Sequence, residues 1–312
     1  MRIAFYAPLK PPTHPSPSGD RRLARMLIQA LEEGGHQVEL ASAFRSYDGG
    51  NAVRQARIRA IGEKLAARLV RRYRARRPAA RPQAWFTYHL YHKAPDWLGP
   101  RISRELAIPY LAAEASHAPK QARGPWAAGF EANRQAIGAA DLVIGLNAAD
   151  GECVLPLLGD EQKLFPLKPF IDTAPYVAAG EDRERYRREL SARHDIDDTV
   201  PWLLSVAMMR PGDKLASYRV LGQALGFIGD RPWRLIAAGF GAARADVEVA
   251  LSGLGDRVSW LGEEMDLAQL AGLYAAADLY VWPAVNEAFG MAFLEAQAAG
   301  LAVVAGRTGG VP

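Results

Sequence analysis

Short apolar runs alternate along this chain with longer stretches in which apolar residues recur every three or four positions. The N-terminal half contains six apolar runs of strand length, at residues 3–7, 38–41, 85–88, 109–113, 142–146 and 164–167. A proline-rich loop follows the first run, and a helical pattern then covers 19–34 with Leu23, Leu27 and Leu31 on one face. This alternation of strands and helices predicts a parallel sheet with helices on both faces.

The alternation restarts in the C-terminal half. Its predicted strands are 202–207, 234–238, 258–261, 279–282 and 301–305, and its predicted helices lie near 214–228, 242–254, 266–275 and 290–299. The pattern is lost over 169–182, which we interpret as a linker between an N-terminal domain, 1–174, and a C-terminal domain, 175–312. We therefore predict an α/β fold of two Rossmann-like, doubly wound parallel-sheet domains that face a cleft.

Composition narrows the class of protein. The 312 residues include one cysteine, Cys153, which excludes an internal disulfide and a cysteine-based structural zinc site. No apolar run approaches the roughly 18 residues of a membrane span, and the N-terminus lacks a signal peptide, so we expect a cytoplasmic protein. The chain ends in a loop directly after a predicted strand, so we expect it to be shortened at the C-terminus.

Charge is unevenly distributed. The segment from Arg54 to Arg81 holds eleven basic residues and one acid, a net charge of +10, whereas the rest of the chain carries −6. An apolar stripe of Ile58, Ile61, Leu65, Leu69 and Tyr73 runs along it at helical spacing. Such a helix either packs on the sheet with its arginines in water or approaches an anionic surface, such as a membrane. Nucleic acid is not expected, because the chain contains no binding module for it.

The segment with the most chemistry surrounds a predicted helix start near Gly290. Glu287 precedes this helix and Glu295 lies inside it, eight positions later. Free N–H groups of a first helical turn favour anionic or hydroxyl-rich ligands, and a carboxylate can accept two sugar hydroxyls at once. Two glutamates at this spacing are also common by chance, so the pair alone indicates little.

The surrounding residues make the pattern specific. From Leu273 to the C-terminus the chain resembles the retaining glycosyltransferases of family 4, which have the GT-B fold. The resemblance rests on the Glu–seven residues–Glu spacing and on the final Gly-Gly-Val-Pro. It implies that Glu287 lies by the donor sugar, that Glu295 holds the nucleotide ribose, and that the amides of Phe289, Gly290 and Met291 meet the sugar hydroxyls and phosphate.

A second match follows the strand at 202–207. The family usually has Gly-Arg there and a lysine about six residues later, and this basic pair neutralises the leaving diphosphate. Lys214 fits, whereas Ala207 and Met208 replace the Gly-Arg pair. Arg210 either supplies the missing charge from a shifted position or is a solvated loop cation.

Glycines at several strand ends match family turns near the donor. Gly19 follows the first strand and matches a turn that lies against the phosphates, although Ser18 also suits an ordinary helix cap. Gly239 and Gly241 form a Gly-x-Gly turn that resembles the one near the donor phosphates. Gly262 ends the next strand, where the family holds the nucleotide base.

Histidines follow two strands of the N-terminal half. The resemblance implies that His117 points towards the donor sugar, and the alternative is a plain loop histidine. His89, Tyr91 and His92 suit acceptor binding, because aromatic and imidazole groups pack on sugars. The two histidines next to Tyr91 are also candidate metal ligands, but no acid or thiolate pattern completes a site, so we predict no metal.

Together these features predict a retaining, metal-independent glycosyltransferase. It would move a sugar from a nucleotide-diphosphate sugar to a glycan or lipid-linked acceptor, with no cofactor beyond that donor. Two alternatives stay open: another GT-B enzyme, such as a nucleotide-sugar epimerase or phosphorylase, and a non-catalytic membrane-associated binding protein.

Overall fold

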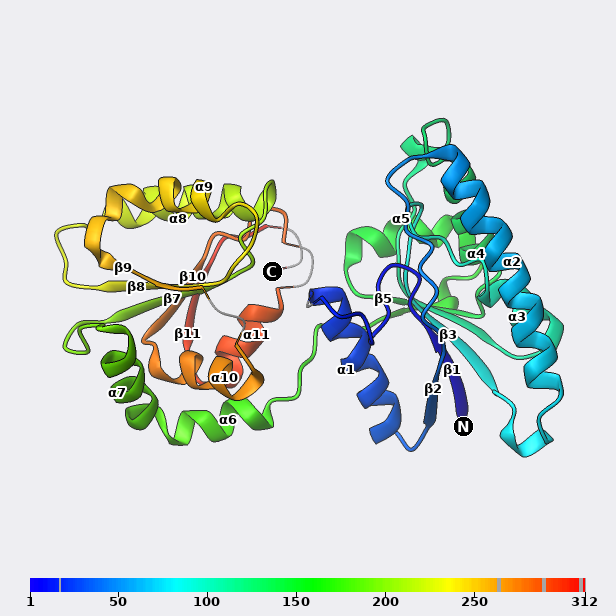
Figure 1. The fold of residues 1–312 in the computed structure, drawn as a ribbon, viewed down its shortest axis with the longest axis horizontal. Coiled ribbons are helices and arrows are strands. Elements are labelled where there is room, and N and C mark those ends of the chain that lie inside the picture. The colour runs from blue at the N-terminus through cyan, green and yellow to red at the C-terminus, as the bar shows by residue number, and fades with distance from the viewer. Residues whose placement is uncertain (17, 263–264, 288–289, 309–310, 312) are drawn as a thin grey trace. The chain divides into compact units, whose positions relative to one another are not determined.

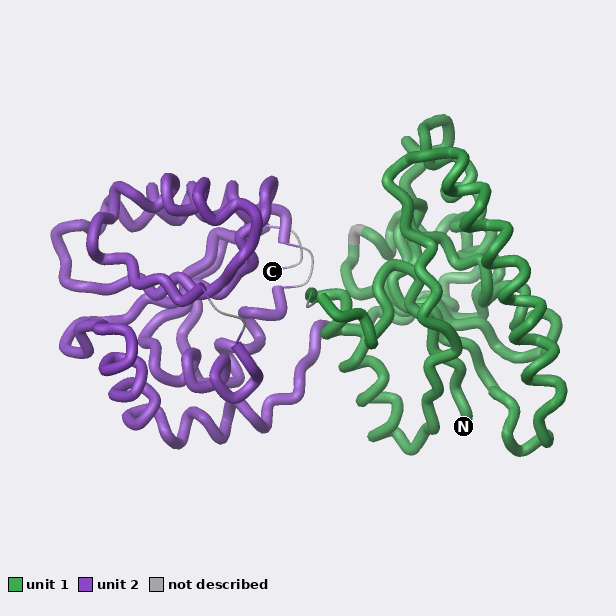
Figure 2. The backbone as a smooth tube through the Cα atoms, viewed as in Figure 1, with its two compact units in different colours: residues 1–168 green, residues 169–312 purple. Residues whose placement is uncertain are grey.

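The chain folds into two compact units, Met1–Lys168 and Pro169–Pro312, shown in green and purple in Figure 2. The structure is a computed structural model that describes residues 1–16, 18–262, 265–287, 290–308 and 311, with the backbone alone for Ala149. Each unit has its own parallel sheet and its own hydrophobic core.

The N-terminal unit contains all six strands predicted from its sequence. They are β1 (Arg2–Tyr6), β2 (Gln37–Ser42), β3 (Ala84–Leu90), β4 (Tyr110–Ala115), β5 (Leu142–Gly145) and β6 (Leu164–Pro166). Its helices are α1 (Gly19–Glu33), α2 (Ala52–Arg74), α3 (Gly99–Leu106), α4 (Ala127–Gly138) and α5 (Ala148–Leu158), with short 3-10 turns at Pro78–Ala80, Pro119–Gln121 and Glu161–Lys163.

The sheet of this unit is parallel in every pairing, in the order β2-β1-β3-β4-β5-β6. The order reverses between β1 and β3, so the loops that follow these two strands diverge at the carboxyl edge of the sheet. Figure 1 shows α1 on one side of the sheet and α2 and α3 on the other. Trp85, Tyr110 and Tyr6 are buried between these layers and form the centre of the core.

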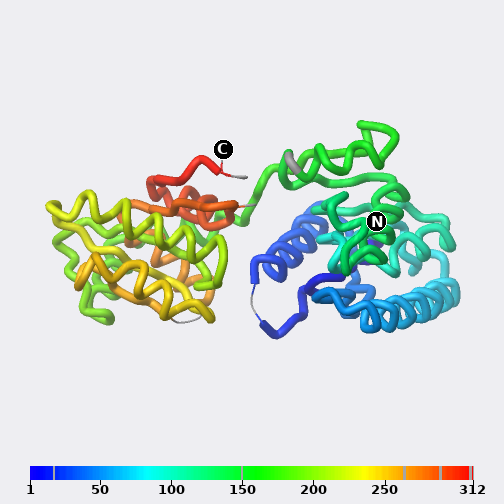
Figure 3. Tube along the Cα trace, turned by 90° about the horizontal axis from the view of Figure 1, so that it is seen from above, coloured from blue at the N-terminus to red at the C-terminus, as the bar shows by residue number. Residues whose placement is uncertain are grey.

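Helix α2 packs on its unit through one face. Gly62, Ala66, Leu69, Val70 and Tyr73 are buried, and the views of Figures 1 and 3 place the helix on the outside of the unit. Part of the predicted apolar stripe therefore forms this contact. Ile61 was wrongly included in the stripe, because it lies on the opposite side of the contact and is 44% exposed.

The C-terminal unit has a five-stranded sheet. Its strands are β7 (Trp202–Val206), β8 (Arg234–Ala238), β9 (Val258–Leu261), β10 (Leu279–Trp282) and β11 (Ala302–Ala305). Its helices are α6 (Ala174–Glu181), α7 (Arg183–His194), α8 (Asp213–Gly226), α9 (Arg244–Leu251), α10 (Leu267–Ala276) and α11 (Met291–Ala298), with a 3-10 segment at Ser252–Arg257.

This second sheet is also parallel and runs in the order β11-β10-β7-β8-β9. Figure 1 shows α8 and α9 on one face and α6, α7, α10 and α11 on the other. The order reverses between β7 and β10, and the carboxyl ends of these two strands define the place where a doubly wound sheet binds its ligand.

The segment predicted as an unstructured linker is mostly helical. Helix α6 occupies Ala174–Glu181 and buries Tyr176 and Ala179 in the core of the C-terminal unit. A proline suits the first turn of a helix, where its missing N–H costs nothing, so Pro175 marks a helix start rather than a break. The compact units divide after Lys168, six residues before the predicted boundary.

Candidate functional site

The reversal point of the C-terminal sheet brings together two predicted charged residues, Lys214 and Glu287, that lie 73 positions apart in sequence. Lys214 lies in the first turn of α8, which follows β7, and Glu287 lies in the loop after β10. The Nζ atom of Lys214 donates a hydrogen bond to Oε2 of Glu287 at 2.5 Å. The side chains are 34% and 18% exposed, so this ion pair is accessible to a ligand while remaining partly shielded from water.

A third side chain contacts both members of this pair. The indole Nε1 of Trp282, the last residue of β10, donates to the same Glu287 oxygen at 3.4 Å, and the Lys214 ammonium lies 5.6 Å from the indole ring centre. Tyr218 packs edge-on against the opposite side of this indole. Trp282 therefore holds the carboxylate and the ammonium in one place.

The loop that carries Glu287 is fastened to helix α8. The backbone N–H of Val285 donates to the buried hydroxyl of Ser217 at 3.0 Å, and the Asn286 amide donates to Asp213 at 3.1 Å. Ala284 and Asn286 both adopt left-handed backbone, with φ of 58° and 51°. Such backbone is unfavourable for alanine, and it persists here because the hydrogen bonds around it fix the loop.

Two helices begin at this edge without a side-chain cap. Gly212 precedes α8 and Gly290 precedes α11, and neither helix start receives a side-chain hydrogen bond. Gly290 has a φ of 66°, which favours glycine. The uncapped N–H groups and the positive ends of the helix dipoles, beside Lys214, can bind a phosphate or another anion.

Glu295 lies inside α11 and is 2% exposed. Its Oε2 accepts a hydrogen bond from the Tyr274 hydroxyl at 2.7 Å. Burial, followed by the charge of Glu295, raises the pKa of Tyr274 well above its usual value, so this hydroxyl stays protonated and able to donate. The carboxylate is thus already bound to one hydroxyl within its own unit.

The predicted glycine turn after β8 has a structural reason for its glycines. A Cβ on Gly239 would lie 1.9 Å from the Ala207 carbonyl oxygen, and one on Gly241 would lie 2.3 Å from that of Met209. Both glycines let the loop after β8 pack against the loop after β7. Gly262 is roomier, since its Cβ would lie 3.4 Å from the Arg244 guanidinium.

The carboxyl edge of the N-terminal sheet carries a partly buried charge cluster. His89 and Glu114 are the penultimate residues of strands β3 and β4, and Asp20 is in the first turn of helix α1. His89 Nδ1 lies 3.1 Å from Asp20 Oδ1 and 3.6 Å from Glu114 Oε2. Burial opposes protonation of His89, but the contact with Asp20 and the charge of Glu114 outweigh it, so its pKa is raised above 6.5.

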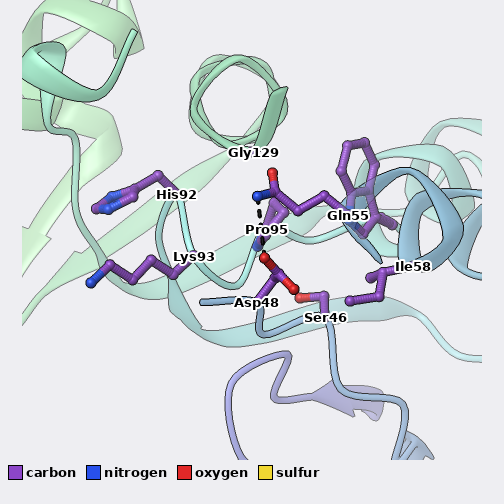
Figure 4. A pocket seen from close by; sticks show the side chains of 9 residues that line it. Ser46, Asp48, Gln55, Ile58, His92, Lys93, Pro95 and Gly129 are labelled. Carbon is purple, nitrogen blue, oxygen red and sulfur yellow. Dashed lines mark hydrogen bonds between the residues drawn. The ribbon is translucent and has the colours of Figure 1, made fainter. Parts of the chain in front are cut away.

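Tyr91 and His92 continue from His89 as a row of rings. The centroids of His89 and Tyr91 are 5.0 Å apart, those of Tyr91 and His92 are 5.4 Å apart, and Trp126 lies 5.8 Å beyond His92. His92 lines a small pocket of about 10 Å³, shown with Lys93 and Asp48 in Figure 4. Burial, followed by Lys93, lowers the pKa of His92, and neither buried ring nitrogen has a hydrogen-bond partner among the described residues.

His117 and Gly19 are the remaining predicted site residues of the N-terminal unit. The His117 ring lies 5.0 Å from that of Phe130, and burial followed by Arg134 lowers its pKa. Gly19 begins α1, and a Cβ there would meet nothing within 4 Å, so neither its backbone nor its neighbours require glycine. Ser18 caps the helix, accepting from the Arg21 N–H at 3.2 Å, as the sequence predicts.

Comparison with known proteins finds a family that matches the part of the chain containing this site. The family model described as glycosyl transferases group 1 matches residues 200–312. This stretch is a group 1 glycosyltransferase domain. It contains the Lys214–Glu287 pair, Glu295 and both uncapped helices.

Curated relatives agree with this assignment of the group 1 glycosyltransferase domain. The chain is 34% identical over 146 residues to the D-inositol 3-phosphate glycosyltransferase of Segniliparus rotundus, which covers 37% of the chain and 32% of that protein. It is 30% identical over 191 residues to the protein of the same name from Salinispora tropica, which covers 57% of the chain and 39% of that protein. The chain thus spans about a third of the length of the curated relatives it matches.

Solved structures extend the likeness to both units. A glycosyltransferase from Rickettsia africae matches with a TM-score of 0.68 at 15% identity, over 99% of this chain and 80% of the other. Anabaena HepE in complex with UDP-glucose matches with a TM-score of 0.62 at 19% identity, over 99% and 81%. The predicted fold class, two Rossmann-like parallel-sheet domains of the GT-B type, is confirmed.

Within the group 1 glycosyltransferase domain, the predicted site residues differ in their surroundings. Lys214 and Glu287 are in direct contact, and Gly290 with Met291 forms the start of α11. Arg210 is exposed in the loop after β7 and contacts the Met208 thioether, so the replacement for the missing arginine stays a prediction. Phe289 lies outside the described residues.

Sequence reasoning missed several residues that build both sites. Ser217 and Trp282 look like ordinary helix and strand residues, and only the fold shows them holding the Glu287 loop. Asp20 and Glu114 could have been found from the sequence. Asp20 directly follows Gly19 at a predicted helix start, and Glu114 directly follows the predicted strand 109–113. No group of three or more histidines, cysteines or acids arranged to hold a metal occurs in the described part of the chain.

Proposed function

We propose that the chain is a retaining glycosyltransferase that takes a nucleotide-diphosphate sugar as donor and works without a metal ion. The observation that carries this proposal is the Lys214–Glu287 pair at the reversal point of the C-terminal sheet, beside two uncapped helix starts. The family match over residues 200–312 and the UDP-glucose complex of HepE support a nucleotide-sugar donor.

The main requirement of the reaction is a group that stabilises the leaving nucleotide. As the bond from the anomeric carbon to the diphosphate breaks, negative charge builds up on the departing phosphate oxygen. Lys214 is the only lysine in residues 169–312, and it stands beside the N-terminus of its own helix. A fixed ammonium and fixed N–H groups stabilise that charge without rearranging, which is the role a metal ion fills in other enzymes.

Glu287 has two tasks in this proposal. In the free protein its carboxylate holds the Lys214 ammonium, together with the Trp282 indole. With donor bound, the same carboxylate accepts hydroxyls of the sugar. The acceptor oxygen then bonds to the anomeric carbon on the face that the diphosphate leaves and gives its proton to the departing phosphate oxygen, so the anomeric configuration is kept. Glu295 binds the ribose, and the N-terminal unit binds the acceptor.

Nucleotide binding and turnover test the proposal directly. Thermal-shift measurements with UDP, GDP, ADP and their sugar conjugates should stabilise the protein, and the nucleotide that binds identifies the donor. Product from that donor, examined by NMR, should keep the donor's anomeric configuration, and turnover should survive EDTA. Inverted product, or activity abolished by EDTA and restored by a divalent cation, would contradict the mechanism.

We further propose that the acceptor is a glycan or a lipid-linked sugar reached at an anionic membrane. No helix in the described residues is long and apolar enough to cross a membrane. The basic residues of α2 and of the short segment after it divide into two groups. Several are engaged, as Arg54 is with Asp48 and Arg76 is with Glu39. A second group is exposed and forms no ion pair in the described part of the chain: Arg57, Lys64, Arg68 and Arg71.

These four cations share one face of the helix. Their spacings of seven, four and three residues place them in a single row, with the exposed Ile61 inside it. The row faces away from the buried contact through Leu69 and Tyr73. A basic row around an exposed isoleucine fits the headgroup region of an anionic bilayer, with about 1 kcal/mol from each cation near the surface.

Vesicle co-sedimentation tests this contact. The chain should bind phosphatidylglycerol vesicles at low salt, and binding should weaken at high salt because screening lengths are about 10 Å at 0.1 M. Replacing the four row residues by Ser should abolish binding. The matched control replaces four exposed arginines of the C-terminal unit by Ser, which removes the same charge: Arg188, Arg193, Arg219 and Arg231. Equal loss in both variants would mean that only net charge matters.

A further inference from the structure

The partly buried cluster at the end of the N-terminal sheet has an unusual backbone. His89 and Glu114 end neighbouring strands and both have left-handed φ angles, 63° and 54°. Left-handed backbone of this kind is strained for a glutamate and is kept only where the surroundings over-determine it. The two side chains turn towards each other and towards Asp20, with His89 Nδ1 between the two carboxylates.

Polar atoms of this cluster lack hydrogen bonds although they are buried. Oε2 of Glu114 is out of contact with solvent and receives no hydrogen bond from any described residue. Its distance of 3.6 Å to His89 is too long for one. A buried carboxylate oxygen without a donor costs free energy, so this atom is poised to accept an O–H or N–H group from a ligand.

The electrostatics decide which ligand fits. Burial raises the pKa of Glu114; His89 and a hydrogen bond from Tyr88 oppose that rise, and the negative charges of Asp20 and Asp150 add to it. A place that already disfavours one carboxylate disfavours a further anion. The positive end of α1 offers no compensation, because Ser18 caps it and Asp20 occupies its first turn.

We infer that the acceptor ring binds at Glu114, Asp20 and His89 through hydroxyl or amino groups and carries no phosphate there. The inference rests on the proposed function and names the class of its acceptor. A carboxylate oxygen that receives no hydrogen bond in the described chain, such as Glu114 Oε2, can accept one from such a ring, whereas a phosphate brings two negative charges and no donors at neutral pH. The basic row of α2 is a separate place on the unit for any phosphate elsewhere on the acceptor.

This acceptor class differs from the one in the relatives' names. The curated relatives of the chain are named for D-inositol 3-phosphate, a phosphorylated cyclic alcohol. Recognition of that phosphate calls for lysine or arginine side chains. At this edge the neighbouring charges that act on Asp20 are His89 and Lys10, set against three carboxylates.

Matched pairs of sugars test the inference without a donor. Dissociation constants are measured by ligand-observed NMR for glucose, glucosamine and glucose 6-phosphate, and for myo-inositol and its 1-phosphate. In the native chain each phosphate should bind at least tenfold more weakly than its parent. Glu114→Gln keeps the shape and removes the charge, and it should cut this ratio to threefold or less. The control Glu32→Gln removes an exposed acid at the far end of α1 and should leave the ratio unchanged.

Two results would overturn the inference: phosphorylated sugars that bind as well as their parents, or a ratio that neither Glu114→Gln nor Asp20→Asn changes. Asp20 is a second test because its side chain is 33% exposed at a helix start, where an amide is also a good residue. Nucleotide thermal shifts on the same samples keep the two proposals apart. Nucleotide binding with phosphate-tolerant sugar binding refutes only the acceptor class, and no nucleotide binding refutes the proposed function.

Discussion

Replacing Lys214 with alanine should affect catalysis far more than stability. The ammonium forms one ion pair, with Glu287, and its side chain is 34% exposed. Water therefore screens the pair, and its loss should lower the free energy of unfolding by about 1 kcal/mol or less. For a chain of this size that corresponds to a melting temperature only about 2–4 °C lower.

The expected loss in turnover is much larger. If Lys214 stabilises charge on the departing diphosphate, its removal acts on the transition state and should slow turnover roughly a hundredfold or more, about 2.7 kcal/mol. Initial rates of nucleotide release from the donor that binds, together with thermal unfolding, give both numbers from one preparation. Lys214→Arg should restore part of the rate because it keeps the charge.

Arg219→Ala is the matched control, since it removes an exposed cation from the same helix, about one and a half turns further along. It should leave rate and melting temperature nearly unchanged. A loss of turnover below about threefold in Lys214→Ala, with the fold intact, would refute the phosphate role. A large drop in melting temperature would instead mean that the Lys214–Glu287 pair is chiefly structural.

Three further changes test other parts of the site. Glu295→Gln should weaken binding of the nucleoside diphosphate by a factor of ten or more in calorimetry, since a charge-assisted hydrogen bond contributes roughly 1.5–3 kcal/mol; unchanged affinity would remove Glu295 from the ribose site. Arg210→Ala should slow turnover at least tenfold if this arginine replaces the one missing at Met208, and little change would identify a solvated loop cation. His89→Asn should destabilise the chain at pH 6 more than at pH 8: because the folded-state pKa of His89 is raised, its stabilising contribution is complete below about pH 6.5 and is lost as the pH rises through the folded-state value. Thermal unfolding of both proteins at the two pH values measures this, and an equal difference at both would mean that His89 does not titrate.

Most of the fold was predictable from the apolar pattern because buried parallel strands are continuous apolar runs. Strands β8, β9 and β10 have the predicted bounds, and the others differ by one to two residues at their ends. Helix α7 escaped prediction for the opposite reason. It is charged at most positions and buries no residue, and its place depends on Arg183 and Arg187 reaching Asp278, about ninety residues later.

The candidate site was predictable only for residues that belong to a short motif with a recognisable spacing. The glutamate pair and Lys214 lie in recognisable short segments, so their roles followed from the resemblance. Ser217 contacts a residue 68 positions away, and Trp282 contacts one 5 positions away. A serine in a helix or a tryptophan in a strand is common, and no sequence spacing predicts such a contact. The direct contact of Lys214 with Glu287 likewise requires the strand order, which places β7 beside β10.

Backbone strain points to the same two places independently of any motif. Six non-glycine residues of the described chain have left-handed φ angles. Ala107 and Asp195 close helices α3 and α7, where this conformation is the normal way to end a helix. The other four lie at strand ends: His89 and Glu114 are the penultimate residues of β3 and β4, and Ala284 and Asn286 lie in the loop after β10. Left-handed backbone is unfavourable for alanine and glutamate, so the surrounding structure must stabilise it. In this conformation Glu114 lies near His89 and Glu287 contacts Lys214.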